Sequence, residues 1–217
     1  MEQGLKSTKH AASLSIQIGG SQLLLFTKRE EDPRFQPFKR RVLARDSFTC
    51  QYCGFESQEH LVITNRNNDY TQNKVGNLLS TCYLCAQTKF IDAAGSVGFC
   101  GGQLIFLPDI EQADLNSLCH VLFHSIALQD SNASQAKNIY RTLKLRGQLI
   151  DKQLGDDMSN PATYCQMLSD ADENQSKKFN HGIGQSTRFL PDVVGYQACV
   201  QDWIRLSFKE LQDYCAS

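Results

Sequence analysis

The segments Cys50-Gln51-Tyr52-Cys53-Gly54 and Cys82-Tyr83-Leu84-Cys85 place two Cys-x-x-Cys pairs within one short stretch of the chain. Two residues between the thiols of a pair permit a tight turn, the zinc knuckle, that directs both sulfurs at one metal ion. Two knuckles complete a tetrahedron, so we predict one structural Zn²⁺ bound by Cys50, Cys53, Cys82 and Cys85. A redox-active Cys-x-x-Cys, or coincidence, is the alternative interpretation, and it accounts for one pair more readily than for two.

Four thiolate ligands leave no open coordination position on the metal, and their negative charge makes the ion a poor Lewis acid. The sequence therefore predicts a structural metal that does not activate water. Structural zinc contributes an apparent binding free energy of about 10–16 kcal/mol, which is comparable to the stability of a whole domain. We expect the cysteine module to unfold when the metal is removed.

The composition around this module is that of an ordinary globular protein. Hydrophobic residues make up 41% of the 217 residues, charged residues make up 21%, and the formal net charge is −1. A dedicated nucleic-acid binder would show a strong basic excess, which this sequence lacks in total. The nine unevenly spaced cysteines favour metal binding and free thiols over a disulfide framework.

The sequence also predicts a cytoplasmic protein. The most apolar stretches, Gly98–Leu107 and Leu118–Leu128, are too short or too interrupted to cross a bilayer. The segment after Lys9 is diluted by Ser, Gln and a glycine pair, which makes a poor signal peptide. Any association with a membrane is therefore expected to be indirect.

Hydrophobic patterning predicts an α+β fold with its strands toward the N-terminus. Alternating apolar residues, a glycine pair and a second apolar run predict a hairpin from Leu14 to Thr27. A short helix from Phe38 to Arg45 should precede the cysteine module, which covers roughly Asp46 to Lys89. A strand from Gln103 to Leu107 is expected after it.

The second half of the sequence is predicted to be mainly helical. A capping box at Asp109 and Gln112 should open a helix that ends near Leu128. Its buried face is predicted from apolar residues at helical spacing, namely Leu115, Leu118, Leu122 and Ile126. A second helix should begin at Ser134 and end at Gly155, a natural left-handed terminator. Its apolar stripe is Ile139, Leu143, Ile150 and Leu154.

A weaker helix is expected from Ala162 to Leu168, followed by an irregular polar linker from Ala171 to Gln185. The last helix should start after Pro191-Asp192, with Trp203 near a buried stripe of Val200, Ile204, Phe208 and Leu211. We expect residues 1–108, the hairpin and cysteine module, and residues 109–217, the helical region, to pack as one compact unit.

The surroundings of the cysteines resemble HNH endonucleases that carry a supporting four-cysteine zinc. The similarity lies in Arg41–Gly54, which contains the first pair, at the entry and in Gly76–Cys85, which contains the second pair, at the exit. The resemblance implies a ββα unit in which an Asp-His pair and a final His or Asn serve a catalytic metal distinct from the zinc. These positions correspond here to Thr64-Asn65 and Ala86, and Asn65 cannot accept a proton from water at neutral pH.

Asn77 alone matches the pattern of those enzymes, and its expected role is to fix the loop. His60 is out of register for a general base, and Asp69, a conceivable displaced ligand, is more simply a turn residue beside Asn67-Asn68. The sequence therefore predicts a nuclease-like scaffold that is not an enzyme. A metal-dependent HNH-type endonuclease with displaced ligands, or a zinc protein that binds nucleic acid, are the alternatives.

Over nearly its whole length, from about Asp32 to the C-terminal helix, the sequence resembles the IcmJ (DotN) family of the Dot/Icm type IVB secretion system. The resemblance is carried by Cys50–Phe55, Asp69–Asn73, Cys85–Gln87, Leu104–Pro108, Leu115–Phe123 and Asn138–Arg141. It implies a bacterial virulence component, a zinc-containing adaptor subunit of the coupling complex. Such a subunit would be recruited to the inner-membrane complex by binding the cytoplasmic tail of the coupling ATPase. Through that tail it would meet other adaptor subunits and support effector recruitment and export, without nucleic acid.

Two basic clusters have open roles. Lys39-Arg40-Arg41 and Arg45 could bind phosphate, or they could offset the negative zinc–thiolate centre on a solvated helix face. Lys137, Arg141 and Lys144 share one helical face, which could meet an acidic partner segment or remain solvent surface.

His120 and His124 are four residues apart and could chelate metal from one side of a helix. The metalloprotease pattern needs Glu directly after the first His, and Val121 stands there. Buried or interface histidines are therefore the simpler interpretation. Cys119 is interpreted as a small buried residue. No role is assigned to Cys100, Cys165, Cys199 and Cys215.

Overall fold

The computed structural model describes residues 12–95, 99–172, 182–197 and 199–205. The elements of the first half are α1 (Gln22–Glu31), α2 (Gln36–Arg45), β1 (Leu61–Asn65), β2 (Leu78–Cys82) and α3 (Tyr83–Thr88), with short 3-10 turns at Val75–Asn77 and Ile91–Ala93. Those of the second half are β3 (Gly102–Phe106), α4 (Gln112–Leu128), α5 (Ala133–Leu145), α6 (Gly147–Leu154), α7 (Pro161–Asp170), α9 (Ile183–Ser186) and β4 (Thr187–Pro191). The predicted α+β class is confirmed.

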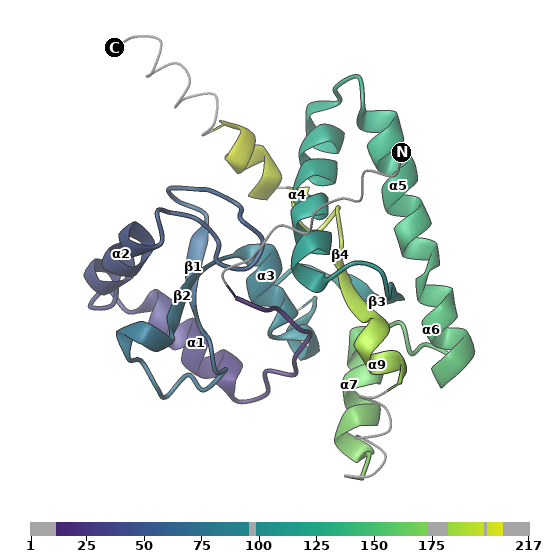
Figure 1. Ribbon diagram of the computed structural model, residues 1–217, viewed down its shortest axis with the longest axis horizontal. Coiled ribbons are helices and arrows are strands. Elements are labelled where there is room, and N and C mark those ends of the chain that lie inside the picture. Colours follow the sequence, from purple (N-terminus) through teal and green to yellow (C-terminus); the bar gives the residue numbers. More distant parts are fainter. Residues whose placement is uncertain (1–11, 96–98, 173–181, 198, 206–217) are drawn as a thin grey trace, which may run out of the picture.

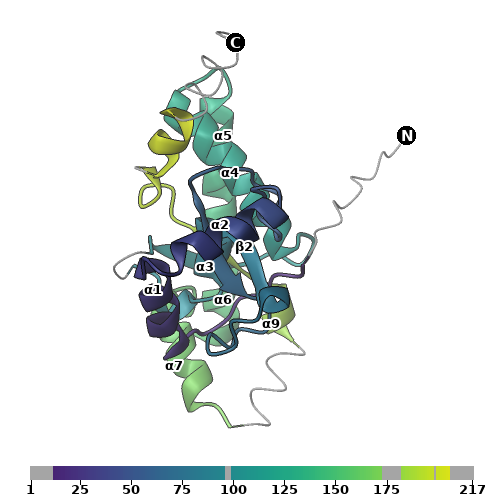
Figure 2. The same cartoon turned by 90° about the vertical axis from the view of Figure 1, so that its left-hand side faces the viewer.

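The N-terminal elements gather on one side of the molecule and α4–α6 on the other, with α3 between them (Figure 1). Helices α1 and α2 pack against the β1–β2 strands, and Figure 2 shows them on the outer side of the molecule. Among the residues that the structure describes, no helix combines the length and hydrophobicity needed to cross a bilayer.

Both sheets are small antiparallel pairs. The β1–β2 pair runs from Leu61 opposite Cys82 to Asn65 opposite Leu78, and every residue of both strands is buried. The second pair joins β3 to β4. The strand β4, which the sequence analysis did not predict, places the ring of Phe189 against Gly102, where a Cβ atom would lie 2.3 Å from it. Only glycine fits there, so the pairing depends on this residue.

The predicted hairpin from Leu14 to Thr27 does not form. Residues 13–19 have no helical or strand assignment. They contact the end of α3 and the segment after it instead: the Gln17 N–H donates to Thr88 O (3.0 Å) and the Ile91 N–H donates to Gln17 O (3.1 Å). The second apolar run, residues 23–26, lies in α1 because it leads directly into Lys, Arg and Glu residues that favour a helix. The glycine pair does turn the chain, but into a helix.

The predicted helices of the second half are present, with different ends. No side chain caps α4, whose N-cap is Glu111, so the capping box at Asp109 and Gln112 is wrong. The predicted helix from Ser134 to Gly155 is divided into α5 and α6 at Gly147. A Cβ atom on Gly147 would lie 2.5 Å from the Gln103 side chain, so glycine permits the junction to approach β3.

Gly155 ends α6 at φ 119° and ψ 168°, a positive-φ conformation that favours glycine as predicted, although this ψ lies outside the left-handed helical geometry of the usual terminator. The helix after Pro191-Asp192 is present in residues 197 and 199–205, where Val200 and Trp203 are buried and Ile204 is partly buried. Phe208 and Leu211, predicted to extend this stripe, lie outside the described residues.

One hydrophobic core joins the cysteine module to the helical region. It includes the cysteines, Leu61 and Ile63 of β1, Leu115 and Leu122 of α4, and Val200 and Trp203 of the last helix. The division of the chain after residue 108 stays a prediction.

The buried side chain of Gln112 attaches α4 to the free edge of β4. Its Nε2 donates to Phe189 O (2.9 Å), and its Oε1 accepts from the Phe189 N–H (2.8 Å). The amide therefore takes the place that a further strand would occupy beside β4.

We expect Gln112→Ala to lower the free energy of unfolding by about 2–4 kcal/mol, because two buried backbone groups of Phe189 lose their partners. Urea denaturation measures this change. Gln148→Ala, at an exposed position on α6, is the matched control and should change stability by less than about 0.5 kcal/mol. Equal effects of the two substitutions would show that the Gln112 amide is not a structural link.

Candidate metal centre

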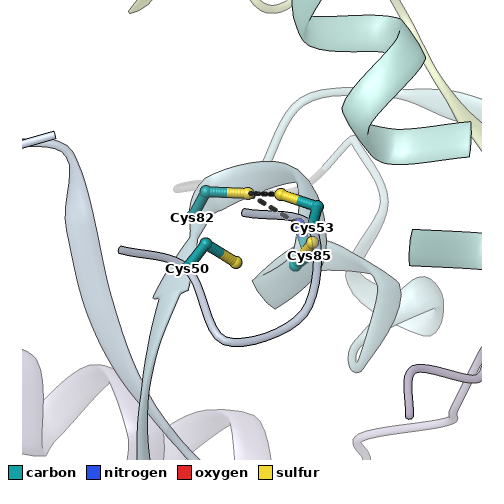
Figure 3. Close-up of side chains that lie close together, drawn as sticks. All are labelled: Cys50, Cys53, Cys82 and Cys85. Atoms are coloured by element: carbon teal, nitrogen blue, oxygen red, sulfur yellow. Dashed lines mark hydrogen bonds between the residues drawn. The ribbon is translucent and has the colours of Figure 1, made fainter. Parts of the chain in front are cut away.

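The four cysteines singled out by their spacing lie together in one buried cluster. Their sulfur atoms all lie within 4.8 Å of one another, and the side chains point toward a common centre (Figure 3). A tetrahedral zinc with Zn–S bonds of about 2.3 Å would hold its sulfurs about 3.8 Å apart, and the Cys53 and Cys82 sulfurs are 3.5 Å apart. This set could hold a metal ion such as zinc.

The local backbone explains how each pair converges. The first pair lies in a tight turn between Thr49 and Glu56, which form an isolated β-bridge, and Gly54 has the positive φ of 79° that the turn requires. The second pair is formed where β2 becomes α3. Cys82 is the N-cap of that helix, and its sulfur accepts a hydrogen bond from the Cys85 N–H (3.5 Å).

Burial makes a cage of four thiolates unfavourable without a cation. Burial raises the pKa of the Cys82 and Cys85 thiols well above their usual value. Burial opposes ionisation of Cys50 as well, but hydrogen bonds from the three other thiols lower its pKa well below the usual value. Deprotonation of all four thiols would therefore require a positive ion at their centre.

Two side chains of α4 contact the sulfurs directly. Asn116 Nδ2 donates to Cys85 Sγ (3.2 Å), and His120 Nε2 lies 3.2 Å from Cys82 Sγ. A metal-bound thiolate can only accept, so His120 would donate through Nε2. Hydrogen bonds of this kind orient metal ligands and offset their charge.

The sequence analysis did not predict these two contacts. A signal was available, because Gln112, Asn116 and His120 recur every four residues and therefore line one side of α4. All three are buried, the first two almost completely. A line of buried polar residues along a helix indicates fixed hydrogen-bond partners, which here include the sulfurs.

The two histidines of α4 do not form a metal-binding pair. His124 is exposed, whereas His120 is buried and stacks on the ring of Phe55 at 4.0 Å between centroids. Burial lowers the pKa of His120 to about 4, so its ring is neutral at physiological pH. His120 therefore contacts the sulfur of a candidate metal ligand, Cys82, and is not itself one of the four candidate ligands.

A buried lysine lies beside the first knuckle. Lys89 Nζ donates to Tyr52 Oη (3.2 Å) and lies over the same ring. Burial lowers the pKa of Lys89 to about 8, while the Cys85 thiol acts in the opposite direction. A positive charge here would partly offset a zinc–thiolate centre.

The basic residues considered for that charge-offsetting role, Lys39 and Arg45, have other partners. Lys39 pairs with Glu30 (2.8 Å), and Arg45 pairs with Asp46 (2.8 Å) while donating to the Leu78 carbonyl of β2. Arg40 and Arg41 are exposed, as are Lys137, Arg141 and Lys144 on α5.

Thr64, Asn65 and Ala86, which the resemblance to nucleases matched to catalytic positions, are fully buried. Every polar atom of the Asn65 side chain has a partner. Its Oδ1 accepts from Arg29 (2.6 Å), and its Nδ2 donates to the carbonyls of Asp69 and Gln72.

The neighbouring polar residues have structural roles. Asp69 accepts hydrogen bonds from Thr71 and Gln72, which confirms a turn residue. Asn77 Nδ2 donates to Asn67 Oδ1 (2.7 Å), which confirms that it fixes the loop. The ring of His60 makes an edge contact with the ring of Trp203, with the centroids 6.1 Å apart.

The remaining described cysteines are free. Cys119 is buried as predicted, Cys165 is also buried, and Cys100 and Cys199 are partly buried. Cys215 lies outside the described residues.

Metal removal tests the centre directly. We predict one zinc per chain by elemental analysis, and loss of cooperative unfolding after chelation, because the binding energy of structural zinc of about 10–16 kcal/mol matches the stability of a domain. Circular dichroism and thermal denaturation measure the change. A preparation that contains no metal and still unfolds cooperatively would disprove a structural zinc.

The contact between His120 and Cys82 predicts that substitutions of His120 and His124 have different effects on zinc affinity. His120→Phe keeps a ring for stacking on Phe55 but removes the N–H group, so we expect zinc affinity to fall about 10–100-fold. Competition with a coloured zinc chelator measures the affinity. His124→Phe changes an exposed residue of the same helix and should leave affinity unchanged. An equal effect of both variants would exclude the proposed thiolate contact.

A known secretion protein matches the chain over nearly its whole length, whereas no protein-family model matches the sequence. The type 4 apparatus protein DotN of Legionella pneumophila (strain Philadelphia 1) is 33% identical over 213 residues, which cover 98% of this chain and 99% of that protein. The resemblance predicted from the sequence is therefore confirmed, and the chain belongs to the DotN family.

Proposed function

We propose that the protein is a non-catalytic, zinc-stabilised subunit of the coupling complex in a Dot/Icm type IV secretion system. The relationship to the type 4 apparatus protein DotN carries this proposal, because it extends over 98% of the chain. In this role the protein is cytoplasmic and binds the cytoplasmic tail of the coupling ATPase, which brings it to the inner-membrane complex. Through that tail it meets other adaptor subunits and supports effector recruitment and export.

We assign Cys50, Cys53, Cys82 and Cys85 as the ligands of one structural zinc. The donor set supports this assignment, since four buried sulfurs at this spacing suit tetrahedral zinc and leave no site for water. When bound, the ion would supply the positive charge that four buried thiolates need. It would also hold the first knuckle against the β2–α3 junction.

We further infer that β1, β2 and α3 form an HNH-type ββα unit that has lost its catalytic centre. The three elements follow one another in that order, with the first cysteine pair before β1 and the second at the β2–α3 junction. Arg29 occupies the side of β1 where a catalytic metal would be held, since its guanidinium contacts both Asn65 and Asn73. A fixed positive charge there disfavours a second metal cation.

A protein partner suits the charges of the surface better than nucleic acid does. The formal net charge is −1, and two of the four basic residues near α2 are paired with carboxylates. Nucleic-acid binding draws most of its affinity from basic residues that contact phosphates.

Binding of the coupling ATPase tail is the central test. We expect the purified full-length protein to retain the purified tail on an affinity column and to elute with it in size-exclusion chromatography. Cys50→Ser/Cys53→Ser should abolish retention, because without the first knuckle the module loses its metal and its fold.

The unmodified full-length protein, incubated with DNA and Mg²⁺ or Mn²⁺, tests the nuclease alternative and should give no cleavage. Failure to associate with the tail or with another component of the secretion complex would refute the adaptor function. Cleavage that His60→Ala abolishes would establish the enzyme in its place.

A further inference from the structure

An open cavity of about 630 Å³ lies between the loop after the first knuckle, helices α4 and α5, and the helix that bears Trp203. We call it the Trp203 groove and define it by its aromatic floor of Phe55, His120 and Trp203, its apolar walls of Val121 and Ile139, and its acidic rim of Glu56, Glu59 and Asp130. Its volume falls within the range of about 300–1,000 Å³ that is typical of ligand pockets.

The floor of the groove is built on the metal centre. The rings of Phe55 and His120 are stacked at 4.0 Å, and the Trp203 ring lies 5.1 Å from Phe55 and 5.0 Å from His120. His120 in turn contacts the sulfur of Cys82. A ligand on this floor would therefore meet side chains that are held in place before it binds, which reduces the entropy lost on binding.

The walls expose apolar side chains on two neighbouring helices. Val121 on α4 is 65% exposed and Ile139 on α5 is 37% exposed, and both line the groove. Exposed apolar residues are common when they are single, but a concave apolar surface with a polar rim is typical of a binding site.

The charge at the rim has one sign. Three carboxylates line the groove, and no Lys or Arg is among the described residues that line it. A hydrogen bond from Ser125 lowers the pKa of the Asp130 carboxyl, which keeps it ionised. The basic residues of α5, which are Lys137, Arg141 and Lys144, are not among the residues that line the groove. The groove therefore favours a positively charged ligand.

We propose that the Trp203 groove binds a segment of the partner tail that presents a large apolar side chain flanked by Lys or Arg. This inference rests on the proposed function and specifies its surface. The apolar side chain would lie on the aromatic floor, where burial of one such residue can supply much of the affinity. The basic neighbours would meet the carboxylates of the rim and fix the register of the segment.

The test compares binding of the purified tail to variants of the full-length protein by isothermal titration calorimetry. Val121→Glu and Ile139→Glu each place a charge on an apolar wall and should weaken binding about 10-fold or more. Leu145→Glu, at a 61% exposed position on α5 outside the groove, is the matched control and should bind as the unmodified protein does. Zinc content and thermal unfolding verify that every variant is folded.

A charge reversal tests the rim separately. Glu59→Lys should weaken binding and reduce its dependence on salt, because one attractive contact becomes repulsive. The substitution leaves the core undisturbed, since the side chain of Glu59 is exposed.

The outcomes separate the two proposals. If the unmodified protein does not bind the tail, the proposed function itself fails. If it binds and the wall variants bind as tightly as Leu145→Glu, the groove is not the binding surface while the function stands. If the wall variants instead abolish self-association and leave tail binding intact, the groove is an interface between two copies of the chain, and the proposal is overturned.

Discussion

The structure depends on the confinement of four sulfur atoms in a space from which water is excluded. Their negative charge is tolerable there only if a cation and hydrogen-bond donors neutralise it. The donors come from distant parts of the sequence, since Asn116 and His120 reach the sulfurs from α4. Contacts to the four sulfurs therefore connect the cysteine loop, the β2–α3 junction and the helical region. A cation held by these sulfurs would therefore stabilise both halves of the molecule.

The β1–β2 pair, which we infer to derive from a nuclease-like scaffold, is closed to solvent along β1. Its free edge at Ile63 is covered by α1, where Glu30 accepts from the Ile63 N–H and Arg29 donates to the Ile63 carbonyl. Covering an edge in this way satisfies its backbone groups and prevents further strand pairing. Arg29 of the same helix also donates a hydrogen bond to the side-chain oxygen of Asn65.

The aromatic floor connects the metal centre to the outer surface. His120 contacts a cysteine sulfur through one nitrogen and stacks on Phe55 with its ring. Phe55 directly follows the glycine of the first knuckle, so the turn that positions Cys53 also positions part of the floor. A metal held by the four sulfurs would therefore fix the side chains that we propose contact a ligand, without contacting the ligand itself.

The sequence by itself determined the four candidate metal ligands and most helices, because these follow from local spacing and composition. It did not decide the structure of residues 14–27. Their alternating apolar residues and apolar run fit a hairpin as well as an extended segment followed by a helix, and only contacts with distant residues distinguish the two. The pairing of strand β4 with β3 depends on the fit of Phe189 against Gly102. The contacts of Asn116 and His120 likewise arise only when α4 packs on α3. Tertiary structure alone decided these features, because each is an interaction between segments that the sequence keeps far apart.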